Sequence, residues 1–160
     1  MAELTPLDEK LGEVLGLAQA AQAATKKVAG LAEDHQELVT RLDTMRKEAE
    51  ETERRVSAHV DGLEGKKTAI HEKGRETKGE AADMMKIYLG DDSDELDGFE
   101  FLTMAEAGEL GHWEIVRTMS GEVGDSAALE LAEWAIPVQQ RHVELVRESS
   151  LELAAEEVAG

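Results

Sequence analysis

The sequence contains no cysteine, which excludes disulfides, iron–sulfur clusters and thiol chemistry. Proline occurs only twice in 160 residues, and aromatic residues make up 3% of the chain. Strand patterns are also missing, because β-branched residues occur singly and no alternating apolar run flanks an Asn-Gly or Asp-Gly turn. The apolar residues are mainly alanine, leucine and valine, a composition that favours long, closely packed helices. These features predict an all-α protein.

Positive charge is scarce, with 17 Lys and Arg against 36 Asp and Glu and a formal net charge of −19. Such a chain repels the phosphate backbone, so we expect no nucleic-acid binding. No apolar run approaches the roughly 20 residues of a membrane-spanning helix, and residues 1–6 do not resemble a signal peptide. We therefore expect a cytoplasmic protein that does not enter membranes. A solvated surface is the first explanation of the acidity; cation attraction and a salty cytoplasm are the alternatives.

Four stretches have the apolar spacing of helices that pack in a bundle. They cover about residues 6–29, 35–64, 97–121 and 126–157. Asp34 is followed three residues later by Glu37, which is the spacing of a capping box, and the same spacing recurs at Asp97. We expect these helices to form a single helical-bundle domain over residues 1–160.

The connection over about residues 66–95 lacks that regular spacing. Glycines interrupt it, and only residues 82–89 have the pattern of a short helix. A connection of this length is too long for a hairpin between neighbouring helices. It suits a crossover along the whole bundle, as in ferritin-like topologies, in which the second and third long helices are parallel. The predicted fold is therefore a ferritin-like four-helix bundle with a long crossover between its second and third helices.

Polar residues on the inward-facing stripes are the candidates for function, because a buried carboxylate or imidazole needs a partner. These residues are Thr52, His59, Glu106, Glu109 and Gln139. Counting about 1.5 Å per residue along each helix places one residue of every helix at a common height. This layer consists of Ala18, Thr52, Glu109 and Gln139.

Ferritin-like di-iron proteins hold their ligands in such a layer, with Glu from two helices and Glu-x-x-His from the other two. Glu109 and His112 have that spacing. Gln139 and His142 repeat it with an amide in place of the carboxylate. Opposite them the layer offers only an alanine and a threonine, so the carboxylates that bridge two irons are lacking.

Residues 111–115 are Gly-His-Trp-Glu-Ile, residues 124–125 form a Gly-Asp turn, and residues 50–53 are Glu-Glu-Thr-Glu. In these motifs, and over residues 105–149 generally, the chain resembles the YciE/YciF-type stress-protein branch of the ferritin-like superfamily. That branch has Glu-His-Tyr-Glu-Ile, a Gly-Asp turn and Glu-Glu-Thr at these places. The resemblance implies a ferritin-like bundle with a stress-related role.

The chain departs from that family at the positions that would hold metal. The leading Glu of the family motif is Gly111 here, and the first-helix Glu falls near Ala18 or Gln19. The carboxylates of the last helix are replaced by Gln139 and Gln140. These departures count against a di-iron centre and ferroxidase-like activity.

The candidate metal ligands are Glu106, Glu109, His112 and His142, with His59 as a further histidine. Each also has a structural explanation. Glu109 and His112 form a hydrogen-bonded core pair in the first interpretation and ligate a metal in the second. Glu106 could simply emerge at the edge of the bundle, and His59 could be a core histidine. We expect no cofactor, or at most one divalent metal such as zinc.

We expect a non-catalytic, stress-related ferritin-like protein that acts by assembly or partner binding. The alternative is a ferritin-like oxidoreductase or iron-handling protein that binds iron or zinc. The second alternative is a structural helical scaffold. On balance the sequence favours a protein without enzymatic activity.

Two helices carry apolar residues outside their inward stripes. On the last helix these are Leu131, Ala135, Val138 and Leu145, with His142 among them. On the third long helix they are Met104, Gly108, Gly111 and Ile115. Helices that are apolar on more than one side need a second partner to cover them, so we expect a homodimer.

Overall fold

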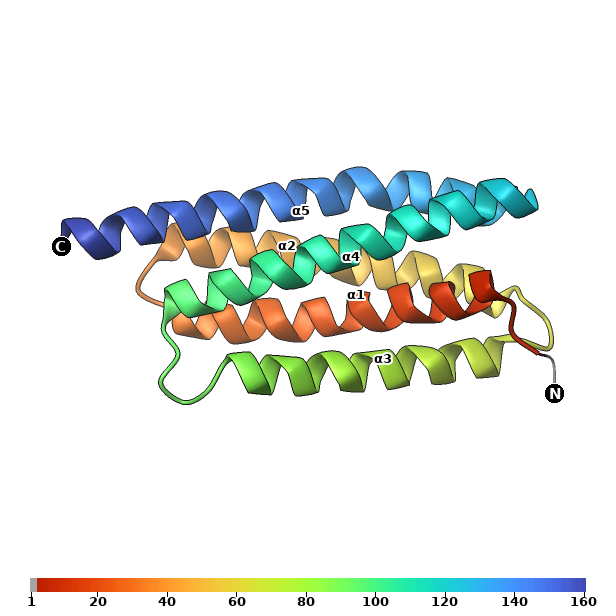
Figure 1. The fold of residues 1–160 in the computed structure, drawn as a ribbon, viewed down its shortest axis with the longest axis horizontal. Helices are drawn as coiled ribbons and strands as arrows, with labels where there is room; N and C mark the ends of the chain where they lie inside the picture. Colours follow the sequence, from red (N-terminus) through yellow and green to blue (C-terminus); the bar gives the residue numbers. More distant parts are fainter. Residues whose placement is uncertain (1–2) are drawn as a thin grey trace.

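The computed structural model describes residues 3–160, and within this range it contains five α-helices and no strand (Figure 1). In chain order they are α1 (Pro6–Leu31), α2 (Gln36–Asp61), α3 (Lys67–Tyr88), α4 (Glu95–Val123) and α5 (Ser126–Ala159). The prediction of an all-α protein is confirmed. None of these helices has an apolar stretch long enough to cross a membrane.

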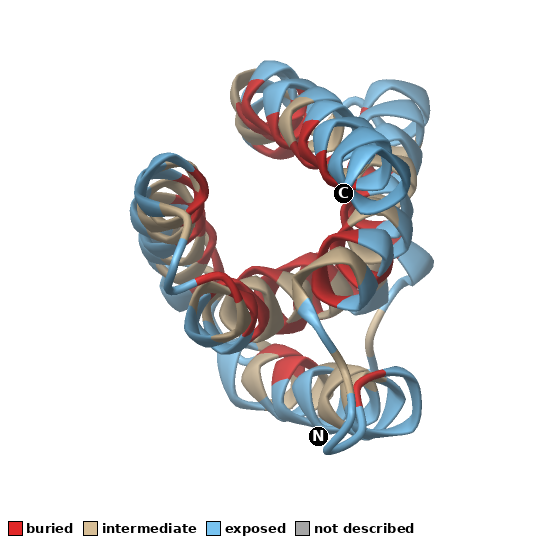
Figure 2. Ribbon diagram, turned by 90° about the vertical axis from the view of Figure 1, so that its left-hand side faces the viewer, coloured by how far each residue is buried: buried red, intermediate tan, exposed pale blue. Residues whose placement is uncertain are grey.

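Four of the helices form a ring. Helix α1 packs against α2 and α4, and α5 packs against the same two helices from the other side. Helices α1 and α5 run in one direction, and α2 and α4 run in the opposite one (Figure 1). An end-on view shows that the buried residues gather on the inner faces of the helices, while the outer faces are exposed (Figure 2).

The connection between α2 and α4 is itself a helix, which corrects the prediction of four helices and an interrupted crossover. Helix α3 is continuous from Lys67 to Tyr88 and runs along the length of α1 on the outside of the ring (Figure 1). Gly74 and Gly79 do not break it. Each glycine costs a helix only about 1 kcal/mol relative to alanine, and packing against another helix can outweigh that cost.

Glycines also allow α3 to approach α1 closely. A Cβ atom on Gly16 would collide with the main-chain oxygen of Gly74, and a Cβ on Gly12 would lie 2.7 Å from the Cβ of Lys73. Gly74 is one of only two fully buried residues of α3; the other is Ile70. The main chains of the two helices are therefore in direct contact. Larger residues in place of these glycines would push the helices apart.

The helix termini differ from the prediction in detail. Helix α2 has His35 as its N-cap with no side-chain cap bond, so the capping box expected at Asp34 is wrong. The box of α4 lies three residues before the expected one: the Asp97 amide donates to Asp94 at 2.9 Å, and the Asp94 amide donates to Asp97 at 3.0 Å. Helix α2 ends at Asp61, before the expected end near residue 64, whereas α1, α4 and α5 each continue past their expected ends.

Two apolar clusters fill the bundle, one toward each end. One is built around Trp113 of α4 and Leu11 of α1. The other is built around Phe99 of α4 and Leu42 of α2. The predicted layer belongs to neither cluster, so a polar section divides the apolar core.

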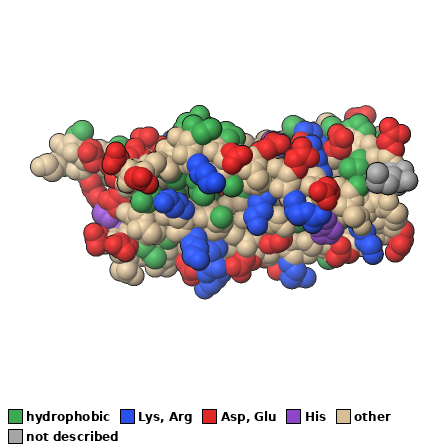
Figure 3. Space-filling model, turned by 90° about the horizontal axis from the view of Figure 1, so that it is seen from below, with side chains coloured by type: hydrophobic (Ala, Val, Ile, Leu, Met, Phe, Trp, Pro, Cys, Tyr) green, Lys and Arg blue, Asp and Glu red, His purple; other side chains and the backbone are tan. Residues whose placement is uncertain are grey.

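The acidic charge is distributed unevenly over the helices. Helix α3 carries five basic and four acidic residues, whereas the whole chain has 17 basic and 36 acidic ones. The view from below in Figure 3, toward the α3 side, shows Lys and Arg side chains spread among the acidic ones on this face. Helix α1 carries equal numbers of acidic and basic residues, so the excess of negative charge lies mainly on α4, on α5 and in the segments between helices.

We predict that Gly16→Ala lowers the free energy of unfolding by about 1–3 kcal/mol, because the new methyl group overpacks the contact between α1 and α3. Gly79→Ala is the matched control, because Gly79 lies mid-helix in α3 with open space at its Cβ position. That change should raise stability by about 0.5–1 kcal/mol. Urea denaturation followed by circular dichroism measures both. Equal effects of the two substitutions would contradict the close approach.

Candidate functional site

The centre of the polar section is a pair of glutamates on α4. Glu106 and Glu109 are 2% and 4% exposed, and they lie on one side of the helix because residues three apart share a face. Burial raises the pKa of Glu106, although His142 and a hydrogen bond from Gln139 act in the opposite direction. Burial also raises the pKa of Glu109, well above its usual value, and the adjacent charge of Glu106 and their mutual hydrogen bond raise it further. Two such carboxyl groups hold a proton between them, with Glu109 as the donor.

Gln139 of α5 is the hydrogen-bond donor to the carboxyl group of Glu106. Its side-chain amide donates to Glu106 Oε2 at 2.8 Å and to the Glu106 main-chain oxygen at 3.0 Å. An amide N–H₂ group suits this position because it supplies two donors. A glutamate at position 139 would instead bring another negative charge against Glu106. Gln139 therefore has a structural role here, as the hydrogen-bond donor to Glu106.

His142 links the glutamate pair to the α2 side of the bundle. One ring nitrogen lies 3.0 Å from Glu48 Oε1, and the other lies 3.8 Å from Glu106 Oε1. Arg141 also reaches Glu48, at 2.8 Å. Burial acts to raise the pKa of Glu48, but the hydrogen bonds from His142 and Arg141 outweigh it and the pKa is lowered. A chain of polar groups thus crosses the bundle from Glu48 to Glu109.

Glu48 was missed by the sequence analysis, which assigned the charged residues around it to the solvent. The available signal was its position four residues before Thr52, since residues four apart share a helix face. All four members of the predicted layer are buried, as expected for Ala18, Thr52, Glu109 and Gln139. The Thr52 hydroxyl donates to the Glu48 main-chain oxygen at 3.1 Å, so it is satisfied within its own helix.

Helix α1 carries two glutamines, close in sequence to Ala18, whose side chains contact α2. Gln19 and Gln22 both donate to the carboxylate of Glu53 on α2, at 2.9 and 2.7 Å. Glu51, by contrast, pairs with arginines of its own helix, and Arg54 is the main cause that holds its pKa at about 2. The Glu-Glu-Thr-Glu motif of α2 therefore serves an interhelical contact and the surface.

Two of the candidate histidines lie outside this cluster. The His112 side chain is 35% exposed; its Nδ1 lies 2.8 Å from the Gly108 oxygen and its Nε2 lies 3.9 Å from Glu13. The expected core pair of Glu109 and His112 is therefore wrong, because the ring turns toward α1. His59 is half-buried, and its Nε2 has no hydrogen-bond partner.

The structure also corrects the expected second stripe of α5. Ala135, Val138 and His142 are buried within the chain, because α5 presents a broader face to α2 and α4 than its first stripe. They are not available to a partner. The second stripe of α4 is exposed, with Met104 at 42% and Ile115 at 41%.

The donor set does not fit a pair of irons. The two buried carboxyls come from one helix and share a proton, and one carboxylate oxygen of Glu106 accepts from the Gln139 amide. Helix α1 adds only an alanine to the layer. Over residues 3–160, no three His, Asp or Glu side chains are grouped in a way that could hold a metal ion.

Comparison with protein-family models, curated protein sequences and solved structures gives no match for this chain. Its function is therefore argued from the geometry of the site.

We predict that Glu109→Gln raises the melting temperature at about pH 8 and that this gain shrinks toward pH 5. The pKa of Glu109 in the folded chain lies above its usual 4.5. The folded state therefore binds more protons than the unfolded state above that pH, and its stability falls as the pH rises through the folded pKa. Glutamine has the shape of the protonated acid and escapes this loss. Thermal unfolding by circular dichroism measures the difference.

Glu114→Gln serves as the control, because Glu114 is an exposed residue of the same helix. We expect it to leave the pH dependence of the melting temperature close to that of the wild type. A Glu109→Gln protein that gains nothing at alkaline pH would show that this carboxyl group ionises as freely as an exposed one.

Proposed function

We propose that this chain is a non-catalytic helical-bundle protein of the ferritin-like type, with a stress-related role in the cytoplasm, and that it acts by assembly or partner binding. The observation that carries the proposal is the hydrogen-bonded pair of Gln139 and Glu106. Where a di-iron protein needs free carboxylates from several helices, this chain joins its polar groups to one another. The layer then stabilises the fold instead of holding a pair of irons.

The arrangement of the helices supports the ferritin-like type over an unrelated scaffold. Helix α3 carries the chain back along the bundle, so that α2 and α4 run in the same direction (Figure 1). A long connection of this kind is typical of ferritin-like bundles. A simple up-and-down scaffold would use short loops throughout.

We predict that wild-type protein purified without chelator contains well below one iron per chain and does not oxidise Fe²⁺. The double variant Ala18→Glu, Gln139→Glu should raise iron affinity at least tenfold, because it supplies carboxylates from two further helices to the layer. Ala18→Gln is the control of matched size without the charge. Metal analysis and oxygen consumption measure the result. A wild-type chain that takes up two irons and consumes oxygen would refute the proposal.

The second candidate function is the binding of a single divalent metal such as zinc. The observation in its favour is that the two ring nitrogens of His142 face carboxylates, at 3.0 Å for Glu48 and 3.8 Å for Glu106. These side chains would have to rearrange to hold an ion, because the described residues form no ready metal-binding group. Imidazole and carboxylate groups are both accepted by zinc. Binding of zinc would require the His142–Glu48 hydrogen bond to open, so it would be lost in His142→Ala.

The exposed stripe of α4 is the surface that we propose for a homodimer. Its members are Met104, Gly108, Gly111 and Ile115, and a Cβ atom at either glycine would meet nothing within 4 Å. Small residues flanked by large apolar ones let a second helix approach closely. Ala135, Val138 and His142 of the first expected α5 stripe are buried, and Leu131 and Leu145 are partly buried against the apolar clusters, so α5 is no longer part of the proposal.

We predict that Ile115→Glu converts a dimer into a monomer, because a carboxylate would be buried in the interface without a partner. Met84→Glu is the control, since Met84 is equally exposed but lies on α3. Light scattering across a wide range of protein concentration measures the mass. A wild-type protein that is monomeric throughout would remove the dimer from the proposal.

A further inference from the structure

A cavity lies between α1, α3 and α4, and the glutamate pair is part of its lining. Its volume is about 80 Å³, and it is partly open to solvent. Its walls are almost entirely apolar: alanines of α1 and α3, together with Met85 and Phe101. The cavity exists because residues 17–24 of α1 are mostly alanine at the height where α3 and α4 face them. Small side chains there leave space that leucines would fill.

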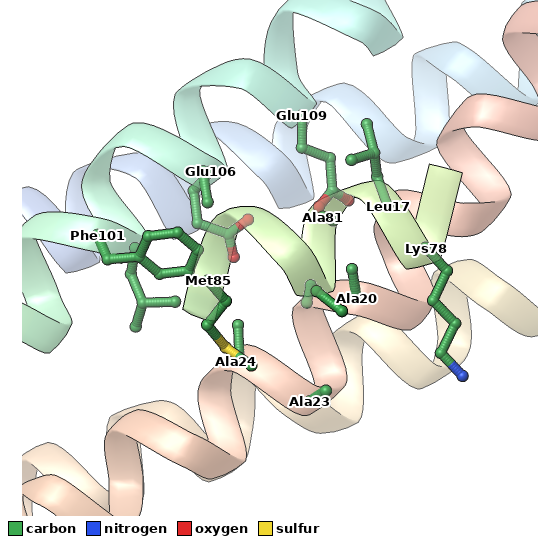
Figure 4. A pocket seen from close by; sticks show the side chains of 14 residues that line it. Leu17, Ala20, Ala23, Ala24, Lys78, Ala81, Met85, Phe101, Glu106 and Glu109 are labelled. Carbon is green, nitrogen blue, oxygen red and sulfur yellow. The ribbon is translucent and has the colours of Figure 1, made fainter. Parts of the chain in front are cut away.

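The two buried glutamates form the polar end of this cavity. Figure 4 shows the Glu109 side chain reaching from α4 toward Ala81 and Leu17, with the Glu106 carboxyl group nearby. Glu109 is 96% buried, since its exposed fraction is 4%. Within residues 3–160 its one hydrogen-bond partner is Glu106, another carboxyl group. The glutamate pair therefore presents its carboxyl groups to an apolar cavity, and among the residues that line the cavity only Lys78 carries a side-chain N–H donor.

We propose that this cavity binds a small aliphatic amine as its ammonium cation, with the ammonium group between Glu106 and Glu109 and the hydrocarbon chain along the alanines of α1 and α3. An ammonium group offers three donors, which the glutamate pair lacks. The apolar walls suit a hydrocarbon chain, and the burial of each CH₂ group tightens binding roughly fourfold. Most ligand sites share this plan of apolar walls with a few convergent polar groups.

The charges around the cavity favour a cation over an anion. Lys78 is the one basic residue in the lining, and its side chain points away from the carboxyl groups in Figure 4. His142 lies behind Glu106, on the opposite side from the cavity, and Gln139 is occupied by Glu106. An alkyl carboxylate would place a third acid beside two buried ones, which is unfavourable for all three.

Binding of the ammonium group also displaces the shared proton. Opposite charge favours the ionised form of a carboxyl group, so the pair should release up to one proton for each amine bound. Affinity should then rise with pH until the amine itself loses its proton. The groups that titrate around the pair are Glu106 and Glu109 themselves, His142 and Glu48 behind them, and Lys78 at the cavity wall.

The test is isothermal titration calorimetry of the full chain at about pH 7.5 with four probes. These are n-hexylamine, n-hexanol as its neutral analogue, hexanoate as its anionic analogue, and methylamine as a cation without the chain. We expect hexylamine to bind at least tenfold more tightly than each of the other three. Titration in two buffers of different ionisation enthalpy should show that protons are released on binding.

Two variants test separately how much the carboxyl charge and the apolar cavity contribute to binding. Glu109→Gln should weaken hexylamine at least tenfold and leave hexanol unchanged, while Ala81→Leu should abolish binding of both by filling the cavity. Glu114→Gln, on the outer face of α4, should bind hexylamine like the wild type. Circular dichroism confirms that each variant is folded.

Equal affinity for hexylamine and hexanol, a preference for hexanoate, or hexylamine binding that survives in Glu109→Gln would each overturn the inference. The inference goes beyond the proposed function, because it requires neither that the chain forms a dimer nor that it is a ferritin-like protein without a di-iron centre. A chain that takes up two irons and consumes oxygen would refute the proposed function, and a monomeric chain would only remove the dimer from it. Calorimetry of the metal-free chain with hexylamine tests the inference separately.

Discussion

Two carboxyl groups lie side by side in the middle of a bundle whose two ends are apolar, and the rest of the central section is arranged around them. Burying an isolated carboxylate costs several kcal/mol, so Glu106 and Glu109 must either share a proton or find donors. The chain uses both solutions. Glu109 keeps its proton and donates it to Glu106, and Glu106 also accepts from the Gln139 amide. His142 then connects this pair to Glu48 at the edge of the bundle.

The two sides of this polar layer therefore differ. On the α2 and α5 side, His142 lies within hydrogen-bond distance of Glu48, and the path ends in the ion pair of Glu48 with Arg141. On the α1 and α3 side, Glu109 faces a cavity walled by alanine. The same carboxyl pair is therefore structural on one side and accessible to a ligand on the other. A closely approaching α3, held by the contact of Gly16 with Gly74, forms the outer wall of that cavity.

The glutamines of the central section have a common role in this network. Gln139 donates to the carboxylate of Glu106 from α5, and Gln19 and Gln22 donate to the carboxylate of Glu53 from α1. An amide provides a hydrogen-bond donor to an acid without adding a second charge.

The sequence by itself determined the helical class, the inward stripes of four helices and the burial of Ala18, Thr52, Glu109 and Gln139. These features depend on the repeat of a single helix, 3.6 residues per turn, and can be counted along the chain. Only the tertiary structure decided that α3 is a continuous helix, that His142 faces inward while His112 turns away, and that Glu48 joins the layer. Each of these depends on how a helix is rotated about its axis, and that rotation is set by the neighbours it packs against, not by its own repeat.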